Sequence, residues 1–167
     1  PRDNSPKGPP GSPGPAPEGF DYDMWLGPAP WKPYVPGRCH WNFRWIRDYS
    51  GGQITDWAGH HCDIAQWGMG TQLTGPVSVR GSGVYPPDGL YDTVEKWRFE
   101  CDYAEGFTMS VAGDNRMGVT FKGSDGWIYV TRGHMETYPK SLLKSTIGPN
   151  EAHLYKSDDH RQNFLDC

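Results

Sequence analysis

The sequence predicts an α+β fold with an open, mainly antiparallel β-sheet that has one face covered by a helix. Three observations lead to this class. Residues 53–68 repeat apolar side chains at steps of three and four, as one face of a helix does. From Val77 onward the period falls to two, which is typical of strands that bury a single face. The 22 glycines and 16 prolines favour short strands joined by many turns.

The length allows one domain, and composition sets an N-terminal arm apart from it. A chain of 167 residues is long enough for one core but too short to add a complete dinucleotide-binding unit. Residues 1–19 contain seven prolines and four glycines, which favour an extended, polyproline-like arm or linker. We therefore expect an α+β domain over residues 20–167, truncated at both ends. Eight Trp, nine Tyr and six Phe predict an aromatic-rich core.

The elements before the sheet follow from local patterns. Residues 20–34 interleave aromatic side chains with prolines, so we expect an ordered loop pinned by aromatic contacts. Residues 41–47 alternate large apolar and polar side chains and predict a strand or extended segment. Residues 53–68 predict a helix that ends at Gly68 and Gly70. The predicted broad buried face of this helix comprises Ile54, Trp57, Ala58, His61, Ile64, Ala65 and Trp67.

The second half of the chain is predicted to consist of strands and the start of a helix. Alternating patterns place the strands at residues 77–85, 96–103, 107–111, 119–121 and 127–130. Residues 138–158 show no period and predict an irregular excursion. Polar residues at 157–159 are N-cap candidates for a helix that begins at His160.

Composition excludes several classes of partner. A formal charge of −4 leaves no basic patch for nucleic acid, and no apolar run approaches the length of a membrane span. We therefore expect neither a nucleic-acid nor a membrane partner, and the compartment stays open between cytoplasmic and exported. The cysteines lack CxxC spacing, which favours free thiols over a bridge. They are Cys39, Cys62, Cys101 and Cys167.

Reactive side chains concentrate on the predicted helix. Asp56 and His60 are one turn apart, so a carboxylate can orient an imidazole that exchanges protons near neutral pH. The same spacing also suits an ordinary structural pair. A metal site is the weaker interpretation, because neighbouring residues such as His60, His61 and Cys62 point about 100° apart on a helix.

A second group of residues has the composition of a sugar site. Aromatic rings can cover the C–H faces of a sugar, and carboxylate, amide or guanidinium groups can bind its hydroxyls, although core packing explains the same aromatics. With Asp63 from the helix, the residues that we assign to substrate binding are Trp25, Arg44, Trp45, Asp48 and Asp63. No strand, GxGxxG turn and helix occur in succession, so this chain is not expected to hold NAD alone.

Residues 51–63, GGQITDWAGHHCD, resemble the pattern Gly-Gly-x-x-x-Asp-x-x-x-His-x-x-Asp of the Gfo/Idh/MocA oxidoreductases. The resemblance covers nearly the whole chain. Further segments of the sequence are similar to members of a large environmental-bacterial branch of that family. These segments are residues 23–30, 41–49, 118–133 and 160–167. The family's catalytic lysine lies in a Glu-Lys-Pro motif of its Rossmann domain, and the role is not transferred to Glu95-Lys96-Trp97 here.

The resemblance implies a C-terminal substrate-binding and oligomerisation domain of a sugar or cyclitol oxidoreductase. It implies His60 as general acid/base and Asp56 as the carboxylate that orients the substrate or the histidine. NAD or NADP would bind mainly to a Rossmann domain outside this sequence, the open sheet face would join copies into a homo-oligomer, and the isolated fragment would be inactive. Two alternatives stay open: an NAD-dependent glycosidase of the same family, and a non-catalytic oligomerisation or carbohydrate-binding module.

Overall fold

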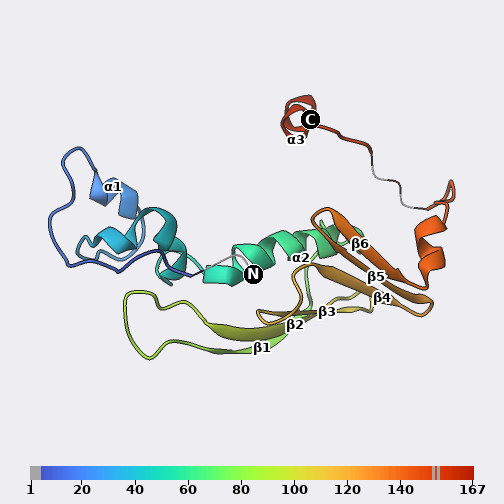
Figure 1. The fold of residues 1–167 in the computed structure, drawn as a ribbon, viewed down its shortest axis with the longest axis horizontal. Coiled ribbons are helices and arrows are strands. Elements are labelled where there is room, and N and C mark those ends of the chain that lie inside the picture. Colours follow the sequence, from blue (N-terminus) through green and yellow to red (C-terminus); the bar gives the residue numbers. More distant parts are fainter. Residues whose placement is uncertain (1–4, 152, 154) are drawn as a thin grey trace. The chain divides into compact units, whose positions relative to one another are not determined.

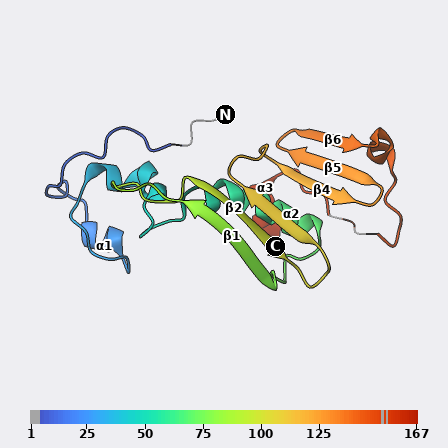
Figure 2. The same ribbon diagram turned by 90° about the horizontal axis from the view of Figure 1, so that it is seen from below.

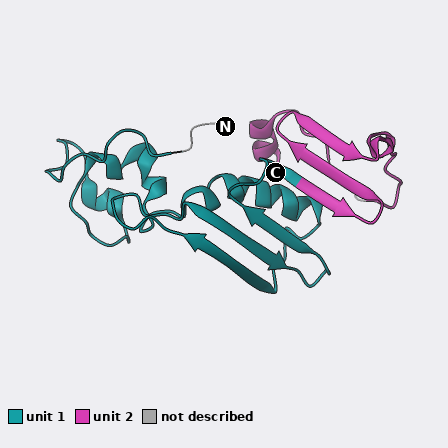
Figure 3. Ribbon diagram, turned by 60° about the horizontal axis from the view of Figure 1, so that its bottom comes forward, with its two compact units in different colours: residues 1–119 teal, residues 120–167 magenta. Residues whose placement is uncertain are grey.

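The structure is a computed structural model that describes residues 5–151, 153 and 155–167. The chain divides into two compact units, Pro1–Val119 and Thr120–Cys167 (Figure 3). The first unit contains an aromatic N-terminal region followed by a helix and a sheet. The second contains a separate small sheet, so each unit is described by itself.

The N-terminal region of the first unit is built from short helices (Figure 1). They are α1 (Tyr22–Leu26) and the 3₁₀ helices η1 (Pro36–Arg38), η2 (His40–Trp45) and η3 (Gly52–Ile54). The preceding segment is tied to them by main-chain hydrogen bonds. The Gly14 amide donates to the Tyr34 carbonyl at 3.1 Å, and the Gly37 amide donates to the Pro10 carbonyl at 2.8 Å.

The predicted strand at residues 41–47 is wrong, because most of this segment forms η2. Burial also differs from the prediction: the apolar side chains of Trp41 and Phe43 are exposed, whereas the polar Asn42 is buried. The Asn42 side chain is drawn inward by hydrogen bonds to the main chain of Lys7 at 2.8 and 2.9 Å and to the Tyr91 hydroxyl at 2.9 Å. These long-range partners of one polar side chain explain the difference.

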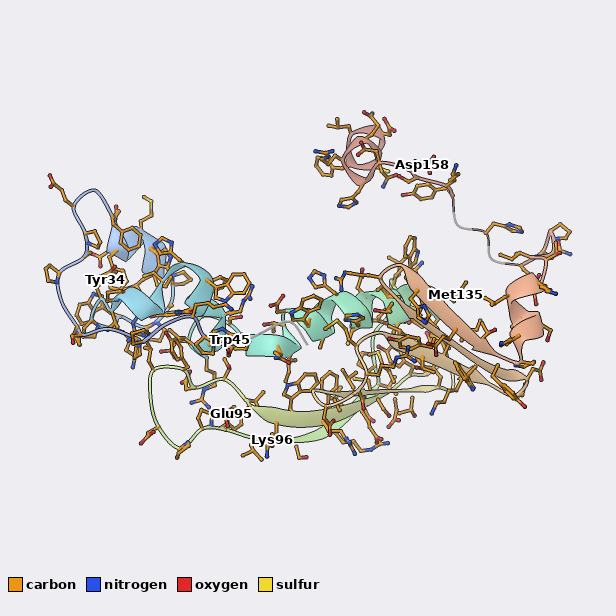
Figure 4. The ribbon with its side chains drawn as sticks, in the orientation of Figure 1. Tyr34, Trp45, Glu95, Lys96, Met135 and Asp158 are labelled. Atoms are coloured by element: carbon orange, nitrogen blue, oxygen red, sulfur yellow. The ribbon has the colours of Figure 1, made fainter. Side chains whose placement is uncertain are left out.

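An aromatic cluster forms the core of this region, as the composition predicts. Tyr22, Leu26 and Cys39 are buried at its centre. The Tyr22 ring lies edge-on to Tyr34 at 5.4 Å and stacks on Trp25 at 5.8 Å, both geometries that aromatic pairs favour. Figure 4 shows the side chains of this region, with Tyr34 and Trp45 labelled.

Helix α2 (Trp57–Gly68) begins four residues later than predicted and ends at the predicted glycine. Its predicted broad buried face is wrong. Of the described residues in the helix only Ala58 is buried, while Ile64 is 38% and Trp67 52% exposed. Cys62 of the helix lies near Cys101 of the neighbouring sheet, whereas the apolar side chains of Ile64 and Trp67 stay exposed.

The sheet of the first unit consists of β1 (Ser78–Val84), β2 (Lys96–Asp102) and β3 (Thr108–Ala112), in that order. Both pairings are antiparallel, with Val79, Cys101 and Met109 side by side across the sheet. Helix α2 runs along one face of this sheet (Figures 1 and 2). The predicted α+β class, with a helix against an antiparallel sheet, is therefore confirmed.

The opposite face of this sheet carries a polar network centred on Arg80. Its guanidinium forms ion pairs with Glu100, at 2.7 Å, and with Asp102. The Asp102 carboxylate also accepts hydrogen bonds from the hydroxyls of Ser78, at 2.8 Å, and Thr108, at 2.7 Å. These bonds, in the order Thr108, Ser78 and Arg80, lower the pKa of Asp102 to about 2.

The second unit holds the remaining strands in a sheet of their own. Its order is β4 (Val119–Gly123), β5 (Gly126–Thr131) and β6 (His134–Tyr138). The predicted meander is thus divided between two sheets, because β3 and β4 do not pair, and the alternation rule did not find β6. Next come η4 (Lys140–Lys144) and α3 (His160–Asp166). The predicted N-cap is confirmed, since the Asp159 carboxylate accepts hydrogen bonds from the amides of Arg161 and Gln162.

Two further properties concern the described part of the chain as a whole. None of its helices has both the length and the apolar character that a membrane crossing requires. The four cysteines are free thiols, with Cys39 and Cys101 buried. Burial raises the pKa of both thiols.

Candidate functional site

A polar hollow lies at the N-terminal end of α2, and we call it the helix hollow. Its volume is about 440 Å³, and it is lined by Thr55, Asp56, Gly59, His60 and Asp63. Asp56 and His60 lie one turn apart at the start of α2, and the His60 amide donates a hydrogen bond to the Asp56 carbonyl at 3.3 Å. The structure therefore places both predicted catalytic residues, and the predicted substrate residue Asp63, around one hollow.

The carboxylate of Asp56 is oriented by a residue from another element. Oδ2 of Asp56 lies 3.4 Å from Nη1 of Arg44 in η2, and the two side chains are 24% and 18% exposed. The guanidinium of Arg44 also lies over the Trp41 ring, 3.8 Å from its centroid. A cation held between a ring face and a carboxylate has few alternative positions. Arg44 therefore positions Asp56 at the edge of the helix hollow.

The imidazole of His60 remains available to a ligand. Within the described part of the chain its side chain contacts the Trp57 ring, at 6.1 Å between centroids, and makes no hydrogen bond. Its neighbour differs, because Nδ1 of His61 lies 2.8 Å from the Trp57 carbonyl oxygen. One ring nitrogen of His61 is thus engaged by the helix main chain, whereas neither ring nitrogen of His60 makes a hydrogen bond with a described residue.

A second hollow of about 550 Å³ lies in the N-terminal region, and we call it the aromatic hollow. Its lining comprises Trp25, Leu26, Pro28, Ala29, Pro30, Phe43, Asp48 and Tyr49. Trp25 and Asp48 thus lie apart from Asp63, although the sequence suggested a single sugar site. Trp45 lines neither hollow: it is 7% exposed and its buried indole N–H has no hydrogen-bond partner among the described residues.

Several residues of these sites were missed by the sequence reasoning. Trp41 stands three positions before Arg44 in η2, a spacing at which side chains of a helical turn meet, but the segment was assigned as extended. Phe43 and Tyr49 carried no signal that separates them from core aromatics. By contrast, Lys96 begins β2, Glu95 directly precedes it, and neither lines a hollow (Figure 4).

The strongest pKa shifts in the described residues occur outside the helix hollow. Burial, followed by the neighbouring Tyr49, raises the pKa of Tyr22 to about 12. Burial and then Cys101 raise the pKa of the Cys62 thiol on the sheet side of α2. No group of three or more His, Cys, Asp or Glu residues in the described chain is placed to hold a metal ion. The helix hollow is therefore distinguished by the geometry of its lining residues.

Comparison with known proteins supplies the family context. A family model described as "Oxidoreductase family, C-terminal alpha/beta domain", for Gfo/Idh/MocA proteins, matches residues 11–162. This range includes both hollows and both sheets. No curated protein matches the chain with significant similarity.

Proposed function

The chain belongs to the Gfo/Idh/MocA oxidoreductase family as its C-terminal α/β domain, and from this premise we propose that it binds the substrate and moves the proton in an NAD(P)-dependent oxidation of a sugar or cyclitol. One observation carries the proposal. Asp56 is engaged by Arg44, whereas the adjacent His60 imidazole lines the same hollow without a hydrogen-bond partner among the described residues. This arrangement leaves an acid/base group facing the ligand and a carboxylate beside it.

In the proposed reaction, a ring nitrogen of His60 accepts the proton of the substrate hydroxyl. Asp56 and Asp63, which line the same hollow, accept hydrogen bonds from neighbouring hydroxyls and so orient the ring. Arg44 keeps the Asp56 carboxylate in place for this role. In the reverse direction, the imidazolium of His60 returns the proton to the carbonyl oxygen.

When bound, an oxidised nicotinamide would accept the hydride that the substrate carbon loses in such an oxidation. The described residues do not fit its pyrophosphate, because the pairings β1–β2, β2–β3 and β5–β6 are antiparallel and no parallel strand leads through a glycine-rich turn into a helix. We propose that NAD or NADP is held by a Rossmann domain outside this sequence. The chain alone is then expected to be inactive.

The polar face of the first sheet is proposed as a contact between copies of the chain. Arg80, Glu100 and Asp102 present fixed charges there, and none of the described residues of the first unit covers the face opposite to α2. Fixed charges of both signs suit a self-complementary interface. A monomer in sedimentation velocity of the full-length protein, at micromolar concentration, would contradict this part of the proposal.

Replacement of His60 tests the catalytic proposal in the full-length protein. His60→Ala is expected to lower turnover by a factor on the order of 10² to 10⁴, the range of a lost general acid/base. His61→Ala is the matched control, because that ring is bound to the helix main chain. Turnover is followed by the absorbance of reduced nicotinamide across a panel of sugars and cyclitols.

The outcomes separate the candidate functions. Equal turnover of His60→Ala and the unmodified protein would remove His60 from the mechanism. Cleavage of a glycoside without net change in reduced nicotinamide would assign the NAD-dependent glycosidase reaction instead. Binding of sugars without any turnover would assign a non-catalytic carbohydrate-binding module.

A further inference from the structure

We propose that the aromatic hollow is a second carbohydrate subsite, so that the substrate contains at least two linked sugar rings. The inference rests on the proposed function, because it takes the helix hollow as the place where the reacting ring binds. Both hollows belong to the first unit, and each has a volume in the range of small-molecule sites, about 550 and 440 Å³.

The lining of the aromatic hollow matches the surface of a sugar ring. Trp25, Phe43 and Tyr49 supply apolar ring surface, which suits the C–H faces of a pyranose. Asp48 lines the same hollow, and its carboxylate has no hydrogen bond or ion pair with any described residue. An open carboxylate beside aromatic rings can accept hydrogen bonds from the hydroxyls at the edge of that pyranose.

Charge in and behind the hollow favours a neutral ligand. Arg38 is buried, with 9% exposed, and its Nη1 donates to the Tyr49 hydroxyl at 3.2 Å. No carboxylate among the described residues pairs with this guanidinium, which also lies 5.9 Å from the centre of the Tyr49 ring. An uncompensated buried cation behind Tyr49 opposes a cationic ligand, and Asp48 opposes an anionic one. A neutral polyhydroxyl compound meets neither penalty.

The walls of the aromatic hollow are held in place without a ligand. Trp25 stacks on Tyr22 at 5.8 Å with the planes 14° apart, and Tyr49 meets it edge-on at 5.2 Å. The Tyr22 hydroxyl donates to the Lys32 carbonyl at 2.9 Å, which ties down the loop that carries Pro28 and Pro30. A ligand that binds between fixed walls loses little affinity to the ordering of side chains.

A single short helix connects the two hollows. Phe43 and Arg44 are consecutive residues of η2. Phe43 lines the aromatic hollow, while the guanidinium of Arg44 reaches Asp56 of the helix hollow at 3.4 Å. The two sites therefore border the same element, and a substrate of linked rings that occupies both would run along η2. A free monosaccharide fills only one site.

Fluorine NMR of the full-length protein labelled with 5-fluorotryptophan tests the subsite directly. Trp25 reports on the aromatic hollow, and Trp57 reports on the helix hollow because its ring lies 6.1 Å from that of His60. Their signals are assigned with Trp25→Phe and Trp57→Phe. The probes are glucose and the neutral disaccharides maltose, cellobiose, trehalose and sucrose. We expect at least one disaccharide to shift both signals, and to do so at a lower concentration than glucose shifts the Trp25 signal. A Trp25 signal that no disaccharide shifts overturns the proposal.

Kinetics on the responding disaccharide provide a second test. Phe43→Ala and Asp48→Asn are each expected to lower the ratio of kcat/KM for the disaccharide to that for its reacting monosaccharide by about tenfold, which corresponds to about 1.4 kcal/mol. Trp31→Ala is the matched control, since Trp31 is 68% exposed and does not line the hollow. Equal losses for both substrates would show that Phe43 and Asp48 only support the fold, and would overturn the proposal.

His60→Ala separates this inference from the proposed function. If both hold, His60→Ala lowers turnover of the disaccharide by a factor on the order of 10² to 10⁴ but keeps the shift of the Trp25 signal. Turnover that persists in His60→Ala, with the Trp25 shift retained, contradicts the catalytic role alone. Turnover that is lost, with no Trp25 shift in the unmodified protein, contradicts the subsite alone.

Discussion

The aromatic hollow and the helix hollow border the same 3₁₀ helix, yet their side chains are held in different ways. Around the aromatic hollow, Tyr22 and Leu26 are buried. The centroid of the Trp25 ring lies 5.8 Å from that of Tyr22 and 5.2 Å from that of Tyr49. The residues around the helix hollow that belong to α2 are exposed, and among the described residues of this helix only Ala58 is buried. The region with the less regular backbone thus has the more fixed side chains, because burial limits rotamers more than a helical backbone does.

The difference also assigns different roles to the two hollows. Fixed walls suit recognition of a constant part of a substrate, since their shape does not depend on the ligand. Exposed groups such as His60 suit the proposed proton transfer, because catalytic hydrogen bonds often tighten only once the substrate is bound. Arg44 is the exception at the helix hollow, because its position is set by a contact with Trp41 in the same helix and an ion pair with Asp56 of another element.

Removal of the central ring of the aromatic cluster is the largest expected perturbation of stability. Tyr22→Ala is predicted to lower the free energy of unfolding by about 3–5 kcal/mol, as for other buried aromatic side chains. Ile64→Ala on the partly exposed face of α2, where Ile64 is 38% exposed, is the matched comparison and should cost under about 1.5 kcal/mol. Urea denaturation of the full-length protein measures both. Equal costs would remove the distinction between the two regions.

The next effect concerns the one fixed group of the helix hollow. Arg44→Met is predicted to lower kcat about tenfold, because a lost charge-assisted contact of about 1.5 kcal/mol leaves Asp56 without its partner. Arg44→Lys should recover part of the activity, since it keeps the charge but not the flat guanidinium over Trp41. Steady-state kinetics of the full-length protein measure both variants. A lysine variant no better than the methionine variant would show that stacking on Trp41, and not charge, positions Asp56.

The smallest expected effect concerns the polar face of the first sheet, where stability depends on pH. The pKa of Asp102 is lowered to about 2 in the folded protein, so its contribution is present above the unfolded pKa of about 3.9. That contribution is lost as the pH falls from about 4 to about 2. Asp102→Asn should therefore lose less stability than the unmodified protein between pH 5 and pH 3. Urea midpoints at the two pH values measure this difference, and Asp114→Asn, at an exposed turn, is the control.

Local patterns were sufficient to predict much of the chain. The repeat over residues 53–68 predicted α2, and the alternation after Val77 predicted five of the six strands. The spacing of Asp56 and His60 placed both on one turn, since residues four apart on a helix are neighbours whatever surrounds them. The Gly-Gly-x-x-x-Asp-x-x-x-His pattern and the segments around it were sufficient for the family, which the match over residues 11–162 confirms.

Only the tertiary structure decided which distant residues meet. It placed Arg44 against Asp56, assigned Trp25 and Asp48 to a hollow separate from Asp63, and buried Trp45. It also turned residues 40–45 into η2 and divided the strands between two sheets. The physical reason is the same throughout: a period reports which side chains share a face of one element, whereas contacts between elements depend on how the chain closes its loops.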